Sequence, residues 1–108
     1  MARIQKTVYD VVVATVADYG RMKKMLEKGN LPREQTAAFA RRVAAIDNAL
    51  LAVCDGESEE VRAALLRDIA YRRGYERSEA REYYPAVATF ERRKREAVRM
   101  IGKMLGIV

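Results

Sequence analysis

Hydrophobic residues recur along this chain with the spacing of helices. The clearest stripe follows spacings of four and three residues and consists of Phe39, Val43, Ile46, Leu50 and Val53. Residues three and four apart share one face of a helix, so this stripe predicts a helix that begins near Pro32 and ends at Gly56. A stripe of this length is typical of a helix-bundle core and too short to establish a coiled coil.

The segment after Gly56 predicts another helix. Ser58 suits the capping position, and the helix dipole favours Glu59 and Glu60 in the first turn. Its buried face comprises Val61, Leu65, Leu66 and Ile69, and it ends at residues 72–74.

The first thirty residues are harder to interpret. Apolar residues recur at helical spacing over residues 3–17, although the β-branched run at 11–16 would equally suit a strand. We favour a helix, because the chain offers no second strand to pair with the first. Asp18 is expected to cap a short helix over residues 19–28, which stops at Gly29.

The C-terminal third predicts two helices joined by a turn. A short helix over residues 78–84 is capped by Ser78 and closed by Pro85. The last helix begins near Ala88 or Thr89 and ends at Gly106. Its expected apolar positions are Val87, Phe90, Ala97, Ile101, Met104 and Leu105, and its opposite face carries Arg92, Arg95, Arg99 and Lys103.

These elements predict an all-α fold, a small helical bundle with a C-terminal helix-turn-helix. Residues 1–108 form a single helical domain. Within it, residues 1–54 supply helices for packing or oligomerisation, and residues 58–106 hold the helix-turn-helix region, with a recognition helix at about 89–105. The sequence leaves open whether the protein is a monomer or a homodimer.

Composition argues against catalysis. The chain has no His and a single Cys, Cys54, and its six glycines are scattered singly, so we find no nucleophile pair, zinc site or phosphate loop. The carboxylate pairs Glu59/Glu60 and Glu79/Glu82 are explained by helix first turns. We therefore expect no enzyme activity, no catalytic residues, no metal and no cofactor. Cys54 is expected to be a buried structural thiol.

Net charge points to an acidic partner. The chain carries a charge of +6, and residues 71–108 alone hold ten cations and five anions. The longest apolar run, at residues 11–17, is far below the ~20 residues that cross a bilayer. A lone Cys and the lack of a cleavable signal pattern favour the cytoplasm and no membrane partner.

A helix-turn-helix with a cationic second helix predicts binding to double-stranded DNA. Residues near the start of that helix, Thr89, Arg92 and Arg93, are expected at base edges, and Arg95 and Arg99 along the groove. The full set of candidate DNA-binding residues adds Glu96, Lys103, Arg77 and Arg81, and Arg72 and Arg73 are further candidates for phosphate contact. The simpler alternative is a solvated amphipathic helix whose charges serve solubility.

The residues of this tail resemble a known family. The string VATFERRKREAV over 87–98, followed by Ile101 and a closing Leu105-Gly106, is similar to the C-terminus of small phage transcriptional regulators of the RinA/ArpU type. Upstream, ADYGRMK at 17–23, IDNAL at 46–50 and IAY at 69–71 resemble further segments of that family. Gly20 replaces the family's usual proline, and Ala88 stands where a capping Ser is typical.

The resemblance implies a DNA-binding regulator of phage or prophage late genes in a bacterial host. Because the family's tail resembles region four of sigma factors, it also implies a contact with RNA polymerase, and that implication rests on analogy alone. Two alternatives stay open: a phage small-terminase-like DNA-packaging subunit, and a helical protein-interaction module that does not bind DNA.

Overall fold

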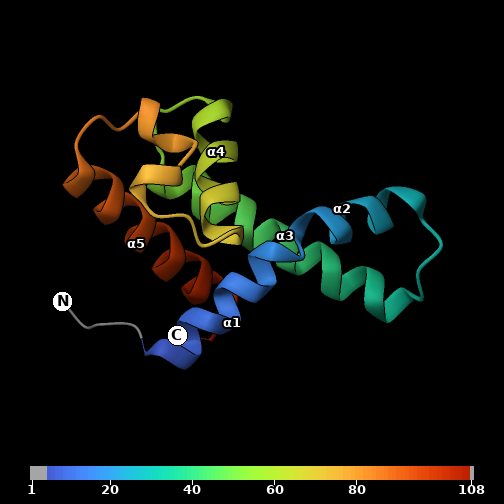
Figure 1. The fold of residues 1–108 in the computed structure, drawn as a ribbon. Helices are drawn as coiled ribbons and strands as arrows, with labels where there is room; N and C mark the ends of the chain where they lie inside the picture. The colour runs from blue at the N-terminus through green and yellow to red at the C-terminus, as the bar shows by residue number, and fades with distance from the viewer. Residues whose placement is uncertain (1–4, 108) are drawn as a thin grey trace.

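The computed structural model describes residues 5–107 and contains five α-helices and two short 3-10 helices (Figure 1). They are α1 (Lys6–Ala17), α2 (Tyr19–Lys28), α3 (Arg33–Val53), α4 (Glu59–Ala70), η1 (Tyr75–Arg77), η2 (Ala80–Glu82) and α5 (Val87–Met104). No strand occurs within residues 5–107, which confirms the all-α prediction for that range. Residues 3 and 4 of the first predicted helix lie outside the described residues.

The ambiguous β-branched segment is the helix α1. Its inner face carries Val12, Val13 and Val16, which are buried, whereas Val11 is about half exposed. A helix satisfies its own backbone hydrogen bonds, so the segment needs no partner strand, and one of its faces still enters the core.

Helix ends follow the sequence signals in most places. Gly29 ends α2 in the left-handed conformation at φ 70°, and Ser58 Oγ accepts a hydrogen bond of 3.4 Å from the Val61 amide at the start of α4. The expected cap at Asp18 is wrong. Asp18 keeps a helical conformation and binds the Arg21 guanidinium at 2.6 Å and 2.7 Å, so α1 and α2 are separated by one residue only.

The helices form a bundle from which an arm projects (Figure 1). α1 packs against α4 and α5, and the second part of α3 packs against α5, around a core that includes Ile46, Leu65, Ile69, Phe90 and Ile101. α2 packs mainly against α3, and α2 and the first part of α3 extend away from the other elements as a helical hairpin. Within residues 5–107, no helix has both the length and the apolar character that crossing a bilayer requires.

The link between α4 and α5 differs from the prediction. Residues 78–84 do not form an α-helix; only Ala80–Glu82 are helical, as the single 3-10 turn η2. Ser78 does not cap a helix there, because its hydroxyl donates to Asp68 Oδ2 at 2.6 Å. The amides of Glu79 and Ala80 also donate to the Asp68 carboxylate, at 2.9 Å and 3.0 Å. Bonds to α4 thus replace the bonds that a local helix would have made.

Asp68 is therefore expected to be essential for stability. Its side chain is fully buried, and Asp68→Ala would leave a hydroxyl and two amides without an acceptor, for a loss of about 3 kcal/mol or more. Urea unfolding followed by circular dichroism measures the change. The control is Asp55→Ala, an exposed acid whose removal should change stability by less than about 0.5 kcal/mol. Equal unfolding midpoints for the two variants would contradict this role of Asp68.

Candidate nucleic-acid interface

α5 has one buried and one exposed face, as its sequence predicts. Phe90, Ala97 and Ile101 are fully buried against the other helices. Two predicted core positions are wrong, because Val87 and Met104 are 53% and 42% exposed. They stand at the two ends of the helix, where the neighbouring helices no longer cover its inner face.

The opposite face of α5 presents four cations. Arg92, Arg95 and Lys103 are exposed and Arg99 is half-buried, in agreement with the predicted stripe. Arg92 reaches Glu96 only at 3.9 Å, with both side chains well exposed. An ion pair of that length in water contributes little, so this face keeps its charge available.

Arg93 lies on the other side of the helix and is held by the fold. Its Nη1 donates to the Val53 carbonyl at 2.9 Å, and its guanidinium pairs with Glu57 and Glu96, each at 3.4 Å. It also lies 5.9 Å from the centre of the Tyr84 ring. The prediction of Arg93 as a base-contacting residue does not fit this placement, because the side chain joins α5 to the end of α3.

Lys94 also bonds within the protein. Its ammonium donates to the Arg73 carbonyl at 2.8 Å, which joins α5 to the residues that follow α4. Burial lowers the pKa of Lys94 below its ordinary value, because the charged form loses water there.

The candidate phosphate-contacting residues before α5 are placed in two ways. Arg72 donates to Asp10 at 3.0 Å, and Arg73 pairs with Asp68 and Glu79, so both are engaged within the fold. Arg77 and Arg81 are exposed, although Arg81 also donates to the Glu76 carbonyl at 2.9 Å.

The turn into α5 is held by Tyr75, which the sequence interpretation missed. The Tyr75 hydroxyl donates to the Pro85 carbonyl at 3.0 Å, and its ring meets Phe90 edge to face with centroids 5.6 Å apart. α5 itself begins at Val87 without a side-chain cap, since Ala86 occupies the capping position. Thr89, a predicted base contact, is half-buried in the first turn.

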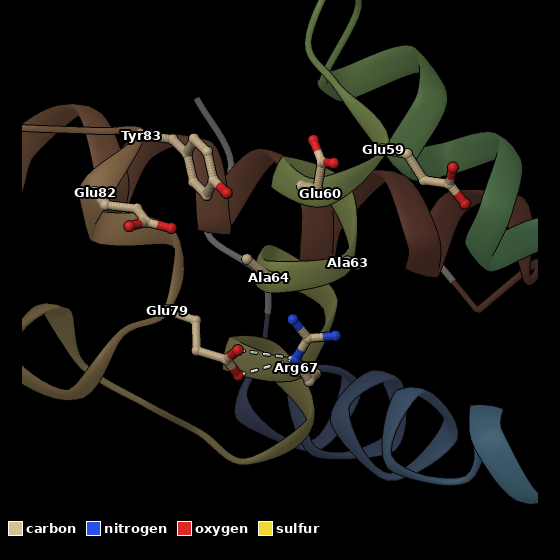
Figure 2. A pocket seen from close by; sticks show the side chains of 8 residues that line it. All are labelled: Glu59, Glu60, Ala63, Ala64, Arg67, Glu79, Glu82 and Tyr83. Atoms are coloured by element: carbon tan, nitrogen blue, oxygen red, sulfur yellow. Dashed lines mark hydrogen bonds and ion pairs between the residues drawn. The ribbon is translucent and has the colours of Figure 1, made fainter.

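A shallow depression between α4 and η2 carries the opposite charge. Figure 2 shows its lining of Glu59, Glu60, Ala63, Ala64, Arg67, Glu79, Glu82 and Tyr83. The one cation in this lining, Arg67, is bound to Glu79, with its Nε 2.9 Å and 3.1 Å from the two carboxylate oxygens. This surface would repel phosphate, so it lies outside the candidate interface.

Comparisons of the chain with protein-family models, curated proteins and solved structures gave no match. The resemblance to phage regulators and the roles that it implies therefore stay predictions.

Replacing Arg93 by alanine is expected to reduce stability more than replacing Arg92. Arg93→Ala removes a bond to a carbonyl and leaves Glu57 without its cation, so we expect a loss of about 1–2 kcal/mol. Arg92→Ala should change stability by less than about 0.5 kcal/mol, because the side chain is exposed. Thermal unfolding followed by circular dichroism distinguishes the two, and a larger effect of Arg92→Ala would reverse the assignment.

Glu79 is expected to make the stability of the fold depend on pH. Hydrogen bonds from Arg67 and Arg73 lower the pKa of Glu79 from 4.5 to about 2. A carboxyl group with a lowered pKa stabilises the fold fully above its unfolded pKa, and that stabilisation disappears as pH falls toward the folded value. The melting temperature of Glu79→Gln should thus lie below that of the parent at pH 7, and the gap should narrow between about pH 4.5 and pH 2. A gap that is constant over this range would contradict the pairing.

Proposed function

We propose that this protein binds double-stranded DNA through the exposed face of α5. The observation that carries the proposal is a division among the cations of the C-terminal third. Arg72, Arg73 and Arg93 are engaged by acids of the fold, whereas the side chains of the outer face of α5 are directed to solvent. Cations that bind phosphate or base edges must keep their donors available, as those on the outer face of α5 do.

The helix dimensions fit this role. An α-helix enters the major groove of B-DNA, where arginine can bind guanine O6 and N7 with two hydrogen bonds or contact phosphate. In the proposed arrangement Arg92 and Arg95 lie nearest to the bases, Arg99 and Lys103 follow along the groove, and Arg77 and Arg81 contact backbone phosphate. Arg93 and Glu96 support α5 from within the protein.

The helix-turn-helix takes a shortened form in this proposal. The 3-10 turn η2 stands where the first helix was expected, and Tyr75 together with Phe90 fixes the entry into α5. A recognition helix must be held firmly to bind its site. The hydrogen bonds to Asp68 hold the segment that leads into α5.

The biological role that we propose is transcriptional regulation of phage or prophage late genes. This part rests on the resemblance of residues 87–106 to RinA/ArpU-type regulators, as does a contact with RNA polymerase. The helices of the first half of the chain would supply a dimer contact if the target site is palindromic.

Arg92→Ala/Arg95→Ala should weaken duplex binding by roughly tenfold or more and reduce the salt dependence of binding, because the duplex then meets two fewer positive charges. Fluorescence anisotropy with duplexes selected from genomic fragments measures both quantities. The melting temperature should not change, because both side chains are exposed.

The matched control is Arg92→Lys/Arg95→Lys, which preserves charge and removes the paired N–H donors of the guanidinium groups. It should retain the salt dependence and lose preference for the selected sequence. Unchanged binding by the double alanine variant would rule out α5 as the reading helix, and salt-independent behaviour of the parent would favour a protein-interaction module.

A further inference from the structure

The helical hairpin carries a strong net positive charge. We call residues 19–43, which comprise α2, the following turn and the first half of α3, the basic arm (Figure 1). The arm contains seven cations and two anions, a net charge of +5, while the whole chain carries +6. The projecting hairpin, which the helix-turn-helix interpretation does not use, therefore carries as large a net positive charge as residues 71–108.

The arm's cations are almost all without acidic partners. Arg21 pairs with Asp18 at 2.6 Å. The six others form no ion pair with any residue of the described chain and are exposed; they are Lys23, Lys24, Lys28, Arg33, Arg41 and Arg42. Lys24 and Lys28 stand one turn apart on one face of α2, where like charges repel and reduce helix stability.

The arm is firmly built in spite of this repulsion. The Tyr19 hydroxyl donates to Asp47 Oδ1 at 2.5 Å, and the Arg21 guanidinium lies 5.2 Å from the centre of the Phe39 ring. Met22 is buried between the helices. The lysines are thus displayed on a rigid support, which lowers the entropy lost when they bind.

The chemistry of the arm fits a phosphate backbone better than other acidic partners. None of the large apolar side chains that are exposed in the described chain belongs to the arm. A helix that binds an anionic membrane inserts such side chains beside its cations, and a protein interface needs them at its centre. Lysines without exposed apolar neighbours suit contacts to phosphate, which position a nucleic acid and carry no sequence information.

α3 connects the arm to the DNA-binding helix. Its second half packs on α5, where Arg93 bonds to Val53, and its first residue, Arg33, lies at the tip of the arm. At 1.5 Å per residue, the two ends of this helix are about 30 Å apart, close to one turn of B-DNA.

We propose that the basic arm is a second DNA-binding surface, which contacts backbone phosphates about one helical turn beyond the segment bound by α5. This inference rests on the proposed function of α5. The arm adds affinity without sequence preference, and α5 supplies the discrimination.

The test neutralises the arm while α5 stays intact. Lys24→Gln/Lys28→Gln/Arg33→Gln should reduce affinity for a duplex of about 25 base pairs by at least tenfold and lower the slope of log affinity against log salt by about 2–3. On a duplex of about 10 base pairs the variant and the parent should bind alike, because the arm then has no backbone to contact. Sequence preference should not change. The matched control, Lys24→Arg/Lys28→Arg/Arg33→Lys, preserves charge and should bind both duplexes like the parent.

The outcomes separate this proposal from the one on α5. If the neutralised arm binds the long duplex like the parent while Arg92→Ala/Arg95→Ala loses binding, the arm proposal is overturned and that for α5 stands. If the parent binds neither duplex, both are overturned. If the neutralised variant binds duplex like the parent but no longer binds vesicles of anionic phospholipid as the parent does, the arm proposal is overturned in favour of a membrane surface.

Discussion

The buried carboxylate of Asp68 is the interaction on which the C-terminal half of this structure depends. A bare carboxylate in a core is strongly unfavourable, and here three hydrogen bonds from residues 78–80 and the nearby Arg73 guanidinium compensate its burial. These bonds hold a segment that has only two single 3-10 turns of its own. Because that segment leads directly into α5, the Asp68 side chain of α4 helps to fix where α5 begins.

The arginines of this protein divide into two groups with different physical roles. Those around Asp68, Glu57 and Glu79 complete a network that binds α4, α5 and the intervening turns together. Within such a network each cation satisfies an acid, and removal of one partner leaves the other uncompensated. Most cations on the outer face of α5 and on the basic arm have no close acidic partner, so their charge is available to a ligand; Arg21, which pairs with Asp18, is the exception on the arm.

Charge is also separated across the surface. The depression of Figure 2 gathers four carboxylates beside α4, while the arm and the outer face of α5 are cationic. Such a distribution orients a protein toward a polyanion before contact and disfavours approach through the acidic side. In the proposed complex the duplex meets α5 and the arm, and the acidic depression stays free.

The sequence by itself determined the five α-helices, although it also predicted a further helix over residues 78–84 that the structure does not contain. Apolar residues at helical spacing located α3, α4 and α5, because such a stripe brings one face of a helix into the core. The β-branched α1 was assigned because the chain offers no partner strand, and α2 was assigned from the stop signal at Gly29. Helical spacing also identified the outward cations of α5, since residues at i, i+3 and i+7 share a face by geometry alone.

The tertiary structure decided which distant residues contact one another. The hydrogen bonds from residues 78–80 to Asp68 join positions ten or more residues apart, and no local sequence pattern predicts them. For the same reason the inward turn of Arg93 was not predicted, because it depends on Val53 and Glu57, which the fold brings beside α5 from another helix and loop. Helical spacing fixes the direction in which a side chain points, and only the packed neighbours determine what it meets there.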